Sequence, residues 1–290
     1  MFIMSKQKEG IAESTHHMFR NSCLRLLEYL NTVDISSWEA ITPETLKEFH
    51  RQDPHTTPEG KNAYSFKIRM FLEYLGEIGR VPSALFLAVP SDYAPHISLI
   101  RTLSNEDIAE LYRFLNNATN GYILRNAAMI LIGLRMGLRA SDITKIKFRD
   151  ISWDQKTISV QQQKTGRFLK LPMPVEVGNA LYRYITQGRP DSFSEYIFIS
   201  HRVPYQRLHR VACATALAKA LPNNPHGFRI TRKTFASRML VKNVSTDKIA
   251  DALGHADNTT VMQYLSTNDD KMRMCAIPLS KIPVKGGALS

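Results

Sequence analysis

Tyr264 is the side chain of this sequence that best suits nucleophilic chemistry. It lies nine residues after His255, in the segment Leu253-Gly-His-Ala-Asp-Asn-Thr-Thr-Val-Met-Gln-Tyr264. Gly254 is able to end a helix and to leave His255 at that end. A tyrosine hydroxyl has a pKa of about 10, so that it needs cationic neighbours to ionise near neutral pH. A single His or Tyr is more often structural, so the segment has to be judged with its cationic partners.

Three cationic segments elsewhere in the chain are candidates for those partners. Arg139 follows an apolar segment, in Gly137-Leu-Arg. Packed neighbours there would fix the guanidinium so that it donates two hydrogen bonds to one phosphate. Lys164 opens the turn Lys-Thr-Gly-Arg, from which an exposed lysine reaches into a groove of DNA. Arg229 and Arg232 gather with Lys233 at the start of a predicted helix, and clustered arginines at helix N-termini bind phosphate. Each segment alone also fits an ordinary helix end, solvated turn or surface charge.

The distribution of charge favours a polyanionic partner. The 290 residues carry a formal net charge of +12. Residues 1–100 hold 10 Lys and Arg against 12 Asp and Glu, whereas residues 101–290 hold 28 against 14. A basic region of this size attracts nucleic acid, although charge also serves solubility.

The cysteines and the apolar segments indicate the compartment. Cys23, Cys213 and Cys275 are few and scattered, which predicts a reducing compartment and neither a disulfide framework nor a zinc site. No apolar run approaches the ~20 residues that cross a bilayer. The first residues have no signal-peptide pattern. We therefore expect a cytoplasmic protein without membrane contact or a structural metal ion.

The first hundred residues predict a small helical domain. Apolar residues recur at helical spacing over 19–30 and 64–78, and Thr42 with Pro43 predicts the start of another helix. Prolines and a glycine predict a loop over 50–61. Residues 88–96 contain two prolines and no helical period, so we expect them to be an interdomain linker.

The rest of the chain predicts helices around one short sheet. Ser104 predicts a helix start, and a long apolar helix should run from about Tyr122 to Gly137. Short β-like runs lie between residues 151 and 173, joined by a turn in which Gly166 is free to take positive φ. After Pro174 the chain should return to helices. The expected fold class is mainly α with a small antiparallel β-sheet.

Taken together, the motifs resemble the tyrosine recombinase (phage integrase) family over most of residues 97–270. Motifs of that family run in the order Arg, Lys, His-x-x-Arg, His or Trp, Tyr. Arg139 matches the first arginine, with Asp142 where the family usually has Glu. Lys164 matches the hairpin lysine, His255 the late histidine and Tyr264 the nucleophile. The joint match makes the structural interpretation of each separate motif much less attractive.

The His-x-x-Arg motif has two possible registers in this sequence. His226-Gly-Phe-Arg229 fits the letters, but the family motif is typically followed directly by a helix resembling Lys233-Thr-Phe-Ala-Ser. Arg232 precedes that helix and has the usual family spacing to the late histidine. The resemblance therefore makes Arg232 the second catalytic arginine and places Arg229 where the family usually has histidine. Arginine does not act as a base near neutral pH, so this departure puts the histidine's proton-transfer role in doubt.

The resemblance also implies an enzymatic mechanism. Tyr264 would attack a DNA phosphate and form a 3′-phosphotyrosyl bond, which another 5′-hydroxyl later reseals. Arg139 and Arg232 would clamp the phosphate, with His255 as a further donor, and Lys164 would protonate the leaving 5′-oxygen. The activity implied is site-specific recombination, for integration or excision of a mobile element. Neither a cofactor nor a small-molecule substrate is implied.

The family's architecture implies two domains clamped around duplex DNA. Residues 1–96 would be the helical core-binding domain, and residues 97–290 a mixed α/β catalytic domain with a tail from about residue 266. Paired sites and four protomers are expected for strand exchange. Two alternatives stay open: a type IB topoisomerase with the same phosphotyrosine chemistry, and a DNA-binding protein whose catalysis is impaired by Arg229.

Overall fold

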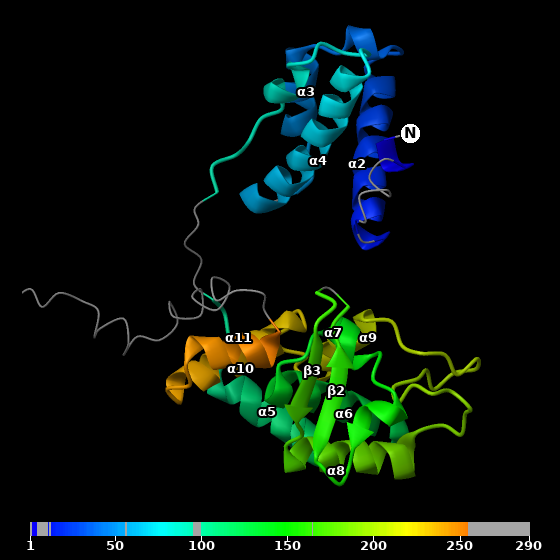
Figure 1. The fold of residues 1–290 in the computed structure, drawn as a ribbon, viewed down its shortest axis with the longest axis vertical. Coiled ribbons are helices and arrows are strands. Elements are labelled where there is room, and N and C mark those ends of the chain that lie inside the picture. The colour runs from blue at the N-terminus through cyan, green and yellow to red at the C-terminus, as the bar shows by residue number, and fades with distance from the viewer. Residues whose placement is uncertain are drawn as a thin grey trace, which may run out of the picture. The chain divides into compact units, whose positions relative to one another are not determined.

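The computed structural model describes residues 2–4, 11, 13–55, 57–94, 100–163 and 165–254. The chain divides into two compact units, Met1–Ser98 and Leu99–Ser290 (Figure 1). This boundary lies two residues beyond the one expected from the sequence. In the described part of the chain no helix combines the length and apolar character needed to cross a membrane.

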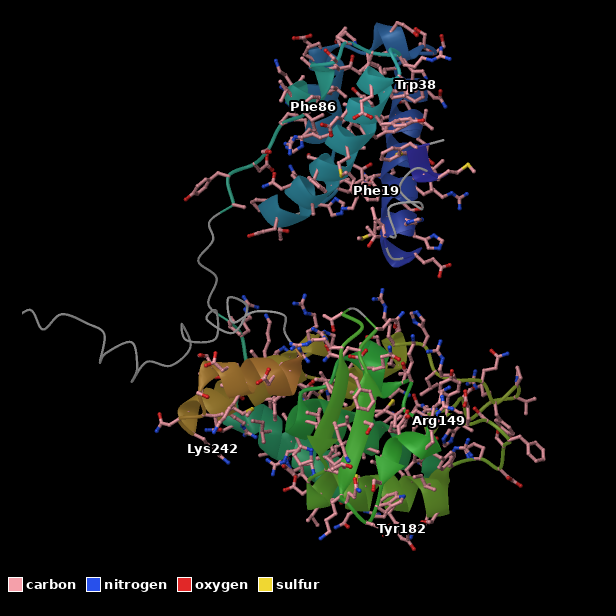
Figure 2. All side chains as sticks on the ribbon, viewed as in Figure 1. Phe19, Trp38, Phe86, Arg149, Tyr182 and Lys242 are labelled. Atoms are coloured by element: carbon pink, nitrogen blue, oxygen red, sulfur yellow. The ribbon has the colours of Figure 1, made fainter. Side chains whose placement is uncertain are left out.

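The N-terminal unit is a helical bundle with its own core. Its described elements are α2 (Glu13–Thr32), η1 (Trp38–Ala40), α3 (Pro43–Arg51), α4 (Pro58–Glu77) and η2 (Leu85–Ala88). Phe19 of α2, Leu46 of α3 and Ile68 of α4 are buried in this core. Trp38 meets the ring of Phe71 edge-on, with the ring centroids 5.6 Å apart. Figure 2 labels Phe19 and Trp38 among these side chains.

Local signals set where the helices of this unit begin. The Thr42 hydroxyl accepts a hydrogen bond from the backbone N–H of Thr45 at 3.2 Å, so the predicted helix start is confirmed. The loop predicted over residues 50–61 is wrong at both ends. α3 continues to Arg51, and α4 starts at Pro58 because Thr57 caps it and proline is tolerated in a first helical turn.

The segment that follows η2 is attached to α4. The Arg69 guanidinium donates to the carbonyl oxygens of Val89, at 3.2 and 3.0 Å, and of Pro90, at 2.8 Å. Asp92 lies 2.9 Å from Nε2 of His50. The prolines exclude a helix here, and the freed carbonyl groups are satisfied by a side chain instead. The first residues of the expected linker therefore belong structurally to the N-terminal unit.

The C-terminal unit is built around one buried helix, α6. Its described elements are α5 (Asn105–Asn116), α6 (Gly121–Met136), α7 (Ala140–Ile143), η3 (Phe148–Asp150), β1 (Ile151–Ser152), β2 (Thr157–Gln161), β3 (Phe168–Pro172), α8 (Val175–Arg183), η4 (Tyr184–Gly188), α9 (Val211–Ala220), α10 (Arg229–Val241) and α11 (Thr246–Leu253). Most of α6 is buried because α8, α9 and α10 all contact it, and a helix that is apolar on every side requires such cover. Figure 1 shows α10 beside α11, and the two are in contact.

The sheet is antiparallel with strand order β1-β2-β3. Ile158 pairs with Leu171, and the last pair of β2 and β3 is Gln161 with Phe168. Ile158 and Val160 face the core, whereas the residues between them are more exposed. Gly166 takes φ +66° in the connecting turn, as predicted. The fold class expected from the sequence, mainly α with a small antiparallel sheet, is confirmed.

One stretch of the C-terminal unit differs from expectation. Residues 189–210 form no helix, although the chain was predicted to be helical after Pro174. The Arg189 guanidinium donates to the carbonyl oxygens of Ser194, Tyr196 and Ile197 at 2.9, 3.0 and 3.1 Å. These side-chain bonds satisfy backbone groups that a helix would otherwise pair.

Candidate active site

Arg232 connects the end of α6 to the end of α11. It lies on the first turn of α10 and is only 8% exposed. Its Nη1 donates to the carbonyl oxygen of Gly137 at 2.8 Å, and its Nη2 donates to that of Leu253 at 2.7 Å. Carbonyl groups at helix C-termini lack intrahelical partners, so one guanidinium satisfies two of them. The C-terminal ends of α6 and α11 are thereby held together.

Gly137 permits this close approach. It ends α6 with φ +67°, a conformation that glycine adopts without strain. A Cβ atom at this position would lie 2.5 Å from the Phe235 ring and 2.8 Å from the Leu253 side chain. The backbone of α6 therefore meets α10 and α11 at contact distance, immediately before Leu138 and Arg139.

Arg139 presents a buried donor that has no partner in the described structure. The residue is the N-cap of α7 and is half-buried, while the preceding Leu138 is 1% exposed. No acceptor among the described residues hydrogen-bonds its Nη1, although that atom is inaccessible to solvent. Buried donors are nearly always paired in native proteins, so the exception needs an explanation. An anionic oxygen is the acceptor that a guanidinium binds most strongly.

Asp142 attaches α7 to the β2–β3 turn. Its side chain is 1% exposed, and its Oδ1 accepts hydrogen bonds from the backbone N–H of Gln163 at 3.1 Å and from the Ser141 hydroxyl at 3.2 Å. Gln163 directly precedes Lys164 in the chain. The segment after Arg139 and the segment before Lys164 are therefore neighbours.

Gln162 joins the same turn to the end of α11, and sequence reasoning overlooked it. Its Nε2 donates to the Leu253 carbonyl oxygen at 2.8 Å, and its Oε1 accepts from the Thr165 hydroxyl at 2.8 Å. The side chain is 1% exposed. The signal that would have found it is the alternation of β2, which places residue 162 on the same buried face as Ile158 and Val160. A buried polar side chain at such a position needs specific partners.

The two candidate registers of the His-x-x-Arg motif have different surroundings. Arg232 is buried at the junction described above, whereas Arg229 is exposed at the first position of α10. His226 lies with its Nε2 3.7 Å from Oδ2 of Asp107, at the start of α5. Of the two arginines, only Arg232 therefore lies at the junction of α6, α10 and α11.

Tyr122 is a described tyrosine with two cations over its ring and a lowered hydroxyl pKa. Lys219 Nζ and Arg125 Cζ each lie 4.5 Å from the centre of its ring. A hydrogen bond with Lys219 lowers the pKa of the Tyr122 hydroxyl below its ordinary value. However, Tyr122 is in the first turn of α6, and Gly137 follows its last turn, so about 20 Å of helix separates them. Tyr122 is thus remote from the arginine site.

The described cysteines do not offer a nucleophile either. Cys213 is fully buried in the core, and burial raises the pKa of its thiol to about 12. Burial likewise raises the pKa of Cys23, in the N-terminal unit, to about 12. The thiolate is the reactive form of cysteine, so both side chains are inert near neutral pH.

The structure thus brings together the end of α6, the turn between β2 and β3, the first turn of α10 and the end of α11. These four segments contain or adjoin the predicted site residues. Arg139 and Arg232 are in the described structure, and so is exposed Arg229. Lys164, His255 and Tyr264 lie outside the described residues, and the expected tail from about residue 266 does too. Their sequence neighbours Gln163 and Gly254 are described. Gly254 ends α11 with φ +63°, and a Cβ there would lie 2.6 Å from the Gln162 amide.

Comparison with known proteins identifies the same family. The model of the phage integrase family matches residues 101–271. Putative integrase/recombinase y4rA of Sinorhizobium fredii is 29% identical over 218 residues, which cover 73% of this chain but only 53% of that protein. Tyrosine recombinase XerD of Listeria innocua is 22% identical over 290 residues, covering 92% of each chain.

Solved structures show the same fold at low sequence identity. A lambda integrase dimer bound to a COC′ core site matches with a TM-score of 0.72 and 16% identity, covering 92% of this chain and 93% of that one. The XerH site-specific recombinase, in a post-cleavage complex with a palindromic difH substrate, matches with a TM-score of 0.69 and 16% identity, covering 95% and 83%. Because the family model covers more than half of the sequence, the chain belongs to the phage integrase family of tyrosine recombinases.

Proposed function

We propose that this protein is a site-specific DNA recombinase that cleaves and rejoins duplex DNA through a covalent 3′-phosphotyrosine at Tyr264, for integration or excision of a mobile element. One observation carries the proposal: Arg232 binds the carbonyl groups of both Gly137 and Leu253. Arg139 lies two residues after the first and His255 two residues after the second. A cationic site for one phosphate is thereby assembled from motifs that are far apart in the sequence.

The roles of the cations follow from the charge of the reaction. Attack by a phenol on a phosphodiester builds negative charge on the non-bridging oxygens, and fixed cations stabilise it. Arg139, whose buried Nη1 has no described partner, would bind one of these oxygens, and Arg232 would add positive charge beside it. His255 would donate a further hydrogen bond. The same cations favour the ionised form of Tyr264.

The bond changes balance without an added cofactor. The ionised Tyr264 oxygen, whose proton has passed to solvent, forms a bond to phosphorus while the bond from phosphorus to the 5′-oxygen breaks. Lys164 donates a proton to the departing oxygen as general acid. In rejoining, a 5′-hydroxyl returns its proton to Lys164 and attacks the phosphotyrosyl bond, which releases Tyr264.

Duplex DNA is the proposed substrate, and four protomers on two paired sites are the proposed assembly. The excess of cations over residues 101–290 supports a DNA partner. The lambda integrase dimer on its core site supports binding of more than one protomer to DNA. Residues 1–96 would act as the core-binding domain and residues 97–290 as the catalytic domain. Mass photometry with two-site DNA should reveal complexes that contain four protomers.

Covalent trapping tests the proposed function. Duplexes randomised in sequence and nicked near the centre are incubated with the protein, so that cleavage next to the nick releases a short strand and prevents rejoining. Denaturing electrophoresis should reveal a protein–DNA adduct, and sequencing the attached DNA should identify a preferred site. Tyr264→Phe should form no adduct, whereas Tyr122→Phe, the matched control, should form it normally.

Two outcomes would contradict this assignment. An adduct that persists in Tyr264→Phe would exclude Tyr264 as the nucleophile. Relaxation of arbitrary supercoiled DNA without any enriched sequence would favour a type IB topoisomerase over a site-specific recombinase.

A further inference from the structure

We propose that Gln162 is a positioning residue that aligns Lys164 for protonation of the leaving 5′-oxygen, an inference that rests on the proposed function. Gln162 itself would touch no DNA, because it is 1% exposed. It would act through the turn that follows it in the chain. This role separates it from Arg139, which is proposed to bind the phosphate, and from Arg232, which is proposed to add positive charge beside it.

The side chain of Gln162 bridges the turn and a fixed point of the site. On the turn side, its Oε1 accepts a hydrogen bond from the hydroxyl of Thr165, the residue after Lys164, at 2.8 Å. On the other side, its Nε2 donates to the Leu253 carbonyl oxygen at 2.8 Å. Both polar ends of the amide are therefore used, and each end selects one orientation of the group.

The Leu253 carbonyl is a suitable anchor because it is itself held. Arg232 donates to the same oxygen at 2.7 Å. Gly254 packs against the Gln162 amide so closely that a Cβ atom would meet it at 2.6 Å. The Gln162 amide is therefore held at the end of α11 by the Leu253 carbonyl and by Gly254. Its hydrogen bond to Thr165 in turn restrains the position of the turn.

The backbone of the turn supplies further restraints on both sides of Lys164. The N–H of Gly166 donates to the Gln162 carbonyl oxygen at 2.8 Å, and the N–H of Gln163 donates to Asp142 at 3.1 Å. These bonds preserve the hairpin when the side chain is changed. We therefore expect loss of the Gln162 amide to impair alignment at the tip without unfolding the sheet.

Misalignment of a general acid has a specific signature. Expulsion of a 5′-alkoxide needs a proton, whereas a 5′-thiolate leaves without one because a thiol has a far lower pKa of about 8.5. DNA in which sulfur replaces the bridging 5′-oxygen therefore bypasses Lys164. A residue that acts only through Lys164 should be bypassed as well, whereas a residue that supports the phosphate clamp or the overall fold should not.

The test compares single-turnover cleavage of the oxygen and sulfur substrates, with the preferred site found by trapping. Gln162→Leu should slow cleavage of the oxygen substrate by about 10-fold or more, since general acid catalysis contributes about 10²- to 10⁴-fold in total. With the sulfur substrate, the variant should come within about 3-fold of wild type. Thr165→Val, which removes only the hydroxyl bound by Gln162, should behave similarly.

Three controls separate this inference from the proposed function. Gln161→Leu changes the exposed neighbouring glutamine and should cleave both substrates at the wild-type rate. The sulfur substrate should restore the cleavage rate of Lys164→Ala but not that of Arg232→Ala. Suppose that the sulfur substrate restores cleavage by Lys164→Ala, but that Gln162→Leu and Thr165→Val are slowed by the same factor on both substrates. The positioning role is then refuted while the proposed function stands. Failure of wild type to form any adduct would instead refute the proposed function.

Discussion

The Nη2 of Arg232 donates to the carbonyl oxygen of Leu253 at 2.7 Å, across 21 residues of sequence. Leu253 is the last residue of α11, and its carbonyl, which lacks an intrahelical partner, accepts from both Arg232 and Gln162. The bond makes the position of the C-terminal end of α11 depend on α10. The same arginine reaches Gly137, so that a single side chain defines the junction on which the proposed chemistry depends.

Substitutions of Arg229 and Arg232, both in α10, should have opposite consequences. Arg232→Ala should lower the cleavage rate by about 100-fold or more, because a preorganised cation near the phosphate is lost. It should also reduce the free energy of unfolding by about 1–3 kcal/mol, since the Gly137 carbonyl loses the donor Arg232 and the Leu253 carbonyl loses one of its two side-chain donors. Arg229→His should leave stability within about 0.5 kcal/mol, because residue 229 is exposed, and should maintain or raise cleavage.

Adduct formation and urea denaturation of the same preparations measure both quantities. Should Arg229→Ala abolish cleavage while Arg232→Ala retains it, the motif would have to be reassigned to His226 and Arg229.

Replacement of Gly254 should damage the junction more than replacement of Gly166. Both glycines have positive φ, +63° and +66°, so alanine at either position incurs a conformational cost of about 1–2 kcal/mol. A Cβ at Gly254 also meets the Gln162 amide at 2.6 Å, whereas at Gly166 nothing lies within 4 Å. Urea denaturation should show Gly254→Ala to be less stable than Gly166→Ala by about 1 kcal/mol or more. Equal losses would mean that the contact with Gln162 is easily relieved.

Asp142 should tolerate asparagine better than alanine. The Asp142 Oδ1 accepts the backbone N–H of Gln163, and an asparagine oxygen is able to replace it, whereas alanine removes this hydrogen bond at a cost of about 0.5–1.5 kcal/mol. We expect Asp142→Ala to be the less stable variant and to cleave more slowly, since the segment before Lys164 loses its restraint. Thermal denaturation and single-turnover cleavage measure the two effects. Identical behaviour of the two variants would show that the bond to Gln163 is unimportant.

The carboxylate of Asp107 should stabilise the C-terminal unit in a pH-dependent way. Burial raises the pKa of Asp107, but hydrogen bonds from the Ser104 N–H and from Asn224, both at 2.9 Å, outweigh burial and hold that pKa below its ordinary value. A depressed pKa in the folded state contributes stability that is present above the unfolded pKa of about 3.9 and is lost as the pH falls through the lower folded value.

The difference in unfolding free energy between wild type and Asp107→Asn should therefore be constant above about pH 5 and shrink below about pH 4. Urea denaturation at a series of pH values measures it, with Asp154→Asn as a control that removes the same charge from an exposed position. A difference that grows as the pH falls would contradict the sign of this shift.

The sequence by itself determined the elements whose signals are local. Capping residues Thr42 and Ser104 begin helices where they were expected, and Gly137 and Gly166 take the positive φ for which glycine is suited. Helical and alternating periodicity distinguished the helices from the three strands. These signals depend on residues within one or two turns of each other, so no distant contact was needed to interpret them.

Only the tertiary structure decided which polar groups meet. Gln162 is one of three consecutive glutamines, and nothing local distinguishes its partners from those of Gln161 or Gln163. Its bond to Leu253 spans 91 residues, and the bond of Arg232 to Gly137 spans 95. Contacts of this kind arise from the packing of α6, α10, α11 and β2 against one another. The same packing buries Arg232 and leaves Arg229 exposed, although the two arginines are three residues apart.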